Sequence, residues 1–160
     1  MKRLYSLFFL LILLCGCQRS SAADLSLSDA LQRVQNALGG KEGFTLADED
    51  FTALNFGTPE YLEGSTICFD SGNDTREIGI FRLSDRRRAQ EMKEKVREYL
   101  ETEQKALASL AHLYPAEELE ERLARYQRAT VGSEGMLVYY FVLDEKDAQK
   151  ALSALTGRQT

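Results

Sequence analysis

The stretch "GSTICFDSGNDTREIGIFRL", Gly64–Leu83, decides the fold because it holds two strands joined by a turn. Apolar side chains alternate with other residues on either side of the turn, which is the pattern of half-buried strands. Gly72 and Asn73 are residue types that favour tight turns. Asp70, Asn73 and Asp74 miss the spacing of an EF-hand calcium loop. The stretch therefore predicts a β-hairpin rather than a calcium site.

A long helix is predicted directly after this hairpin, over about residues 86–113. An apolar stripe recurs there at helical spacing and consists of Ala89, Met92, Val96, Tyr99, Leu100, Leu107, Leu110 and Leu113. At 1.5 Å per residue such a helix is about 42 Å long, more than the width of a domain of this size. We therefore expect either a bend near Thr102–Glu103 or an end that projects. A coiled coil is the alternative that the stripe leaves open.

Two helices are predicted before the hairpin. "LSLSDALQRVQNALGG" carries one apolar stripe, with Ser26 as the expected cap and Gly39–Gly40 as the end. "FTLADEDFTALNF" predicts a second, short helix around Phe51 and Leu54. Three acids, Asp48–Asp50, stand at its start, where the helix dipole favours negative charge without any metal.

Three more elements are predicted after the long helix. Pro115 opens a helix with Leu119, Leu123 and Tyr126 on its buried face. A short strand and an uncharged strand follow, and both faces of the uncharged strand are expected to be covered. Asp144 caps a last helix that Gly157 ends. Strands with segregated helices predict an α+β domain: a small antiparallel sheet of three to four strands covered by helices.

The amino end predicts a lipoprotein signal. Lys2 and Arg3 precede an apolar run of eleven residues, which is too short to span a bilayer but suits a signal peptide. "LCGC" then resembles the bacterial lipobox, with cleavage between Gly16 and Cys17 and a diacylglycerol on Cys17. Cys15 would leave with the signal; a plain secretory signal is the alternative. The expected organisation is a signal over residues 1–16, a lipidated tether over 17–24 and one domain over 25–160.

Composition limits the classes of function. Without residues 1–16 the chain has 18 basic and 25 acidic residues, a net charge of −7 (18 minus 25). An acidic chain without a basic patch is a poor candidate for binding nucleic acid. Cys68 would be the only cysteine besides Cys17, so no internal disulfide is expected and stability must come from the core.

The whole pattern resembles a family of bacterial lipoproteins of unknown function. The lipobox, "REIGIF" (Arg76–Phe81), the long charged helix, "YPAEE" (Tyr114–Glu118) and "GMLVYYFVLDEKDA" (Gly135–Ala148) carry the resemblance. The family is domain of unknown function four-three-five-eight, and the resemblance covers roughly residues 27–155. It implies no activity, cofactor or site residue.

No catalytic constellation stands out. His112 is the only histidine and Cys68 the only free thiol of the domain, and their spacing gives no sign of a nucleophile pair. Cys68 is expected to be buried and inert. So few His and Cys residues leave little basis for a zinc site, and no metal or other cofactor is expected.

The most unusual local feature is the run Arg86–Arg88 at the start of the long helix, where the dipole disfavours cations. Asp85 and Glu91 are placed to reduce that conflict. On a short tether, Arg86, Arg87 and Arg88 could contact anionic headgroups or acidic wall polymers; a solvated helix end is the alternative.

Three functions remain open. The leading expectation is a non-enzymatic lipoprotein on the outer face of the membrane that docks on a membrane or cell-wall protein. It requires an exposed apolar patch, for which Tyr139 and Tyr140 are the candidates. A module that binds a small molecule or wall fragment would require a pocket. An unrecognised enzyme would require convergent acids in a cleft.

Overall fold

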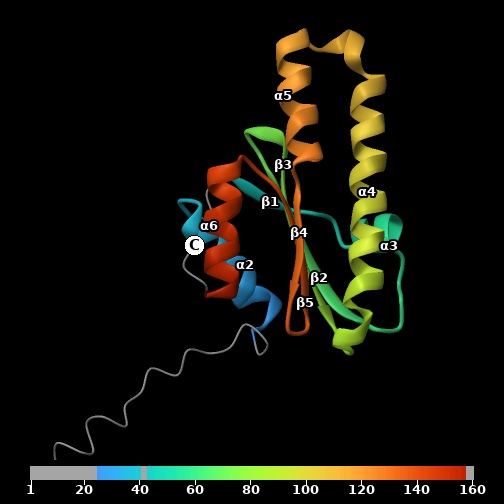
Figure 1. Ribbon diagram of the computed structural model, residues 1–160, viewed down its shortest axis with the longest axis vertical. Coiled ribbons are helices and arrows are strands. Elements are labelled where there is room, and N and C mark those ends of the chain that lie inside the picture. Colours follow the sequence, from blue (N-terminus) through green and yellow to red (C-terminus); the bar gives the residue numbers. More distant parts are fainter. Residues whose placement is uncertain (1–24, 41–42, 158–160) are drawn as a thin grey trace, which may run out of the picture.

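The computed structural model describes residues 25–40 and 43–157 as one α+β domain (Figure 1). Its elements follow the order α2 (Leu27–Ala37), β1 (Phe44–Leu46), α3 (Phe51–Phe56), β2 (Leu62–Asp70), β3 (Asn73–Leu83), a 3-10 turn (Arg86–Arg88), α4 (Ala89–Ser109), a second 3-10 turn (Ala111–Leu113), α5 (Ala116–Gln127), β4 (Thr130–Glu134), β5 (Leu137–Val142) and α6 (Glu145–Thr156). The signal, the lipobox and the tether lie outside the described residues.

The strands form one antiparallel sheet in the order β1-β2-β3-β5-β4. The predicted hairpin is confirmed as β2 and β3, and β5 runs antiparallel to β3 as expected. The predicted three to four strands are too few, because Phe44–Leu46 forms a fifth strand. Its three residues precede the short helix that the sequence predicts around Phe51 and Leu54, and so short an edge strand has no alternating pattern to reveal it.

Helices cover both faces of the sheet (Figure 1). On one face α2 and α6 pack over side chains that include Cys68, Ile78 and Phe141. On the other face α3 and α4 pack over a set that includes Phe81, Val138 and Tyr140. Every residue of β5 is buried, so the expectation that both of its faces are covered is confirmed.

Two glycines let tyrosine rings lie flat on the sheet. Gly79 pairs with Tyr140 across β3 and β5, and a Cβ atom at position 79 would lie 1.9 Å from Cε1 of that ring. Gly132 stands in the same relation to Tyr139 on the other face, with 2.4 Å to its hydroxyl. The absent side chains make room for the rings, as aromatic residues do over strand glycines.

The helix boundaries follow local signals. Ser26 accepts a hydrogen bond from the Asp29 amide at the start of α2, and Gly157 ends α6 in the left-handed conformation.

The expected buried face of α5 needs correction. Leu119, Leu123 and Tyr126 are only half-buried, whereas Arg125 is the buried residue of that helix.

Candidate functional site

The most prominent feature of the molecule is a helical hairpin, formed by α4 and α5, that projects beyond the sheet (Figure 1). The buried residues of α4 are Met92, Val96, Tyr99 and Leu100. From Glu101 to Ala124 no residue is buried. Of the two expectations for a helix of this length, the projecting end is therefore the one observed, and the distal half of the hairpin rests only on itself.

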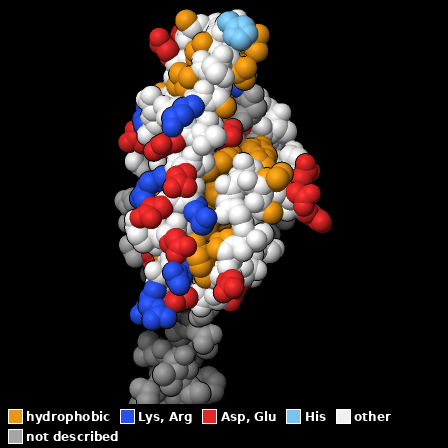
Figure 2. Space-filling model, turned by 90° about the vertical axis from the view of Figure 1, so that its right-hand side faces the viewer, with side chains coloured by type: hydrophobic (Ala, Val, Ile, Leu, Met, Phe, Trp, Pro, Cys, Tyr) orange, Lys and Arg blue, Asp and Glu red, His pale blue; other side chains and the backbone are white. Residues whose placement is uncertain are grey.

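The apolar stripe of α4 continues past the point where the sheet stops. Leu110 is 41% exposed and Leu113 is 64% exposed, so the predicted stripe is buried only as far as Leu100. We call residues 106–121 the hairpin tip. Its exposed apolar residues are Ala106, Ala108, Leu110, Ala111, Leu113, Pro115 and Ala116. Figure 2 shows hydrophobic side chains gathered around the single histidine, His112, at this end.

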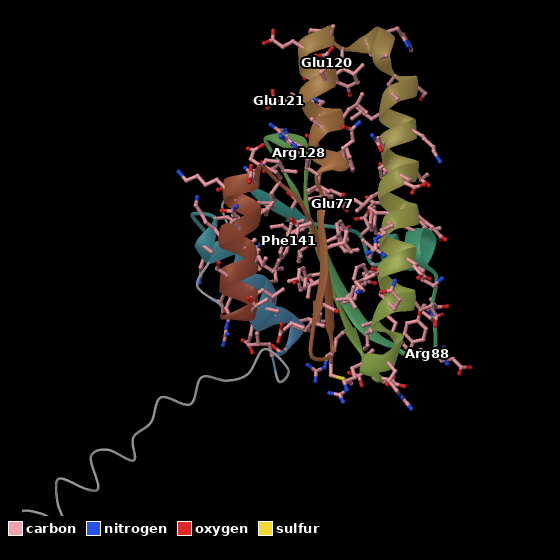
Figure 3. The ribbon with its side chains drawn as sticks, in the orientation of Figure 1. Glu77, Arg88, Glu120, Glu121, Arg128 and Phe141 are labelled. Carbon is pink, nitrogen blue, oxygen red and sulfur yellow. The ribbon has the colours of Figure 1, made fainter. Side chains whose placement is uncertain are left out.

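Two buried polar groups stand at the base of the hairpin. The first is Glu77 of β3, which is 1% exposed and lies between the sheet and α4 (Figure 3). Both of its carboxylate oxygens accept from the Tyr99 hydroxyl at 3.0 Å, and the Tyr140 hydroxyl donates to Oε1. The three groups join α4, β3 and β5 at the point where α4 leaves the sheet.

Burial controls the ionisation of this cluster. It raises the pKa of Glu77 to about 7, although the hydrogen bonds from Tyr140 and Tyr99 act to lower it. Burial and the neighbouring Glu77 carboxyl raise the pKa of Tyr99 and of Tyr140 above their usual values. The tyrosines therefore stay neutral donors, while Glu77 changes its charge near neutral pH.

The second buried group is Arg125 of α5. Its guanidinium donates to the Thr75 hydroxyl at 3.0 Å, to Asp144 at 3.1 Å and to Glu121 at 2.5 Å. Thr75 belongs to β3 and Asp144 precedes α6, so a single side chain ties α5 to two other parts of the fold. Buried charges are tolerated when they are paired in this way, and together Glu77 and Arg125 fix the direction of the hairpin.

The tip carries its own local support. The guanidinium of Arg122 lies 4.9 Å from the centroid of the Tyr114 ring and pairs with Glu118 at 2.8 Å. These contacts join the start of α5 to its second turn. The loop between the two helices is thus held against α5.

The arginine run, Arg86–Arg88, lies at the opposite end of the molecule from the tip, where Figure 3 labels Arg88. Asp85 caps the 3-10 turn through the Arg87 amide at 3.0 Å, and Glu91 pairs with Arg88 at 3.0 Å. The Arg87 side chain is 86% exposed despite its pairing with Asp85. Ion pairs this exposed to solvent contribute little to stability, so these side chains remain able to exchange partners.

The described chain begins beside the same run. Arg82 donates to the carbonyl oxygen of Leu25 at 2.7 Å, and only Leu83, Ser84 and Asp85 separate Arg82 from Arg86. Four residues span at most about 14 Å. The start of the folded domain and the arginine run therefore share one end of the molecule.

The two candidate groups for nucleophilic chemistry are not brought together. Cys68 is buried on the α2 and α6 face of the sheet, where burial raises the pKa of its thiol to about 12, as expected for an inert cysteine. His112 is exposed in the turn at the hairpin tip. Neither Cys68 nor His112 lines any of the hollows described below for the structured part of the chain.

The acidic groups do not form a metal centre within the part of the chain that the structure describes. Asp48 and Glu49 lie before α3, and Asp50 occupies its cap position without a side-chain cap bond. Asp70 accepts from the Gly72 amide and pairs with Arg76, so it belongs to the predicted turn. The side chains of Asn73 and Asp74 are not described.

The proposed apolar patch on Tyr139 and Tyr140 is wrong. Both are buried, Tyr139 at 6% exposure and Tyr140 at 0%, because the rings lie over Gly132 and Gly79. The absence of charge in this strand indicated that both of its faces are covered, but it did not exclude a tyrosine side chain that points to solvent. The exposed large apolar side chains of the described residues are Leu46, Leu54, Leu110 and Leu113.

Surface hollows are present but hold no set of converging reactive groups. One lies between β4, β5 and α6 and includes Arg128, Glu145 and Gln149 among its lining residues. Another lies between α2 and β1 and is lined chiefly by apolar side chains such as Leu31, Phe44 and Leu46. A third, at the hairpin base, includes Arg97, Glu101 and Tyr126 but not Glu77.

No family model matches the chain, and no curated protein and no solved structure gives a match. Across the described residues, no helix is both long enough and apolar enough to cross a membrane. Gly16 and Cys17 lie outside the described residues, so the lipobox stays a prediction.

Sequence reasoning missed Glu77, Arg125 and the hairpin tip. A signal for the tip was present, because the predicted helix was longer than the domain is wide. Glu77 occupies an alternating position of "REIGIF", where a charged residue indicates the solvent face of a strand. Only the tertiary position of Tyr99 and Tyr140 shows that it faces inward.

Proposed function

We propose that this protein is a lipid-anchored interaction module on the outer face of the cell membrane. Its folded domain stands with the arginine run toward the membrane and the helical hairpin directed away from it. The hydrogen bond from Arg82 to Leu25 carries this proposal, because it puts the first described residue of the domain and the arginine run at one end. The proposed anchor is Cys17, after cleavage behind Gly16.

The tether length supports this orientation. Gln18 to Asp24 is seven residues and reaches at most about 25 Å when fully extended. The end of the domain that holds Leu25 therefore stays close to the headgroups. Arg86, Arg87 and Arg88 can then exchange their exposed pairings for lipid phosphates, at about 1 kcal/mol per basic residue near an anionic surface.

The interaction role is supported by the hairpin. The projecting part of the hairpin lies between Leu100 of α4 and Arg125 of α5, the last and first buried residues of these helices. This part adds no buried residue to the core, yet it displays apolar side chains to solvent. Exposed apolar patches on an otherwise charged surface mark sites of protein contact. Within residues 25–40 and 43–157 no group of His, Cys, Asp and Glu side chains converges as a metal site would require, so no comparable observation there favours catalysis.

Cys17→Ser is expected to abolish lipidation and membrane attachment. A serine at this position cannot receive the thioether-linked lipid, and the anchoring chains supply nearly all of the membrane affinity. In cells fed an alkyne analogue of palmitate, the wild type should carry the label and sediment with membranes, and the variant should do neither. Cys15→Ser is the matched control and should behave as the wild type. A labelled, membrane-bound Cys17→Ser protein would contradict the proposed anchor.

A further inference from the structure

Residues 106–121 of the hairpin tip carry charge of one sign only, and the basic residues Lys105 and Arg122 flank them. Residues 106–121 contain four glutamates, Glu117, Glu118, Glu120 and Glu121, and no lysine or arginine. All four are exposed. The exposed apolar residues of the tip therefore sit beside an acidic flank, so a partner that fits the whole surface needs an apolar hollow edged by basic groups.

An anionic bilayer does not fit this surface. The glutamates would be repelled by anionic headgroups, and the tip lies at the end of the molecule opposite Leu25 and the arginine run (Figures 1 and 3). The 21 residues of α4 alone separate the two ends by about 30 Å. The tip thus faces away from the surface to which the proposed anchor holds the domain.

A second copy of the chain does not fit either. A tip-to-tip pair would be symmetric and would bring the same four glutamates together. A pair that joins the tip of one copy to the arginine run of another would raise the second copy about 30 Å above the first. Two copies anchored in one membrane cannot form this pair, because each tether is too short to allow that height.

Side-chain contacts hold the hairpin both at its base and at its turn. Glu77 and Arg125 fix the hairpin to the sheet, and Arg122 holds the turn through Tyr114 and Glu118. A surface that is ordered before binding loses little conformational entropy when a partner arrives.

We infer that the hairpin tip inserts Leu110 and Leu113 into an apolar hollow, edged by Lys and Arg, on a different protein that lies above the membrane surface. This inference rests on the proposed function, because the anchor sets which way the tip points. Glu117 and Glu120 of α5 pair with the basic edge, while Glu118 and Glu121 keep their pairs with Arg122 and Arg125.

The test is photocrosslinking in living cells. A photoreactive phenylalanine replaces Leu110 or Leu113 in the full-length protein, and Leu54 serves as the control because it is an 82% exposed leucine on α3, away from the tip. Both tip positions should crosslink to the same peptide of one other protein, and that peptide should have lysine or arginine beside its apolar residues. Leu54 should give no such product.

Charge reversal separates docking from chance contact. Glu117→Lys with Glu120→Lys should lower the crosslink yield at position 113 by about tenfold or more, since like charges then face each other. The matched control is Glu94→Lys with Glu98→Lys, an equal change of charge on two exposed glutamates of α4 outside the tip, and it should leave the yield unchanged. Thermal unfolding of both double variants shows that the domain is intact.

Each other outcome overturns the inference. The inference is wrong if the tip positions crosslink to lipid, to a second copy of the chain or to nothing. It is also wrong if position 54 gives the same product, or if charge reversal leaves the crosslink yield unchanged. The anchor is judged separately. If the protein is anchored but gives no crosslink, only the docking inference is contradicted. If the wild type is not anchored but still crosslinks, only the proposed anchor is contradicted.

Discussion

Gly79→Ala is expected to destabilise the domain by about 3–5 kcal/mol, the range of severe core overpacking. The new Cβ atom would lie 1.9 Å from the ring of Tyr140, which is fully buried and contacts the rings of Phe56, Phe81 and Tyr99. The ring has no free space to enter, and its displacement would also remove a donor from Glu77. Urea denaturation at neutral pH measures the loss.

The comparison variant is Gly132→Ala. Its Cβ atom would meet the hydroxyl end of Tyr139 at 2.4 Å, but β4 is an edge strand and Tyr139 is 6% exposed, so the ring can move outward. We expect a smaller loss, about 1–2 kcal/mol. A double variant, Gly79→Ala with Tyr140→Leu, should be hardly less stable than Tyr140→Leu alone, since the clash is then absent. Additive losses would show that the clash is not the cause.

Glu77→Gln is expected to change how stability depends on pH. The folded pKa of Glu77, about 7, lies above its ordinary value of 4.5. The folded protein therefore binds this proton more tightly than the unfolded chain does. The stabilisation from Glu77 is complete below about pH 4.5 and is lost as the pH rises through 7, by about 3 kcal/mol in total.

The difference between the two proteins isolates this effect from all other titrating groups. Glutamine is neutral at every pH and can still accept from Tyr99 and Tyr140, so the free energy of unfolding of Glu77→Gln should rise relative to wild type by about 3 kcal/mol between about pH 4.5 and 8. Glu98→Gln, at an exposed position of α4, is the matched control for the loss of one carboxylate. If the difference in free energy of unfolding between Glu77→Gln and wild type does not change with pH, burial does not raise the pKa of Glu77.

The parts of the fold that sequence predicted are those with a strong period or a clear cap. The β2–β3 hairpin, the buried strand β5, the Ser26 cap and the Gly157 end all follow from local patterns. The strand β1 could not be predicted in the same way, because three residues do not establish a period. Its pairing with β2 depends on the position that tertiary packing gives it.

The candidate site was less predictable because its features are tertiary. The stripe of α4 looks uniform in sequence, yet Val96 is buried and Leu113 is exposed, since the sheet ends between them. Arg125 looked like a solvated helix residue, yet it is the buried group of α5 because Thr75 and Asp144 meet it there. A helix longer than its domain was the one sequence feature that pointed to the projecting tip.

The orientation of the anchored domain is the central claim, and it can be measured by the distance of each end from the lipid headgroups. Lipidated full-length protein is placed in vesicles that carry an energy acceptor on the headgroups. A thiol dye is attached at Glu60→Cys, at the end next to Leu62 and Leu83, or at Leu113→Cys. Cys68 is fully buried and stays unlabelled.

We expect strong energy transfer from the dye at position 60 and weak transfer from the dye at position 113, because the length of α4 separates the ends by about 30 Å. Equal transfer from both positions, or stronger transfer from position 113, would mean that the hairpin lies along or against the membrane, and would contradict the account.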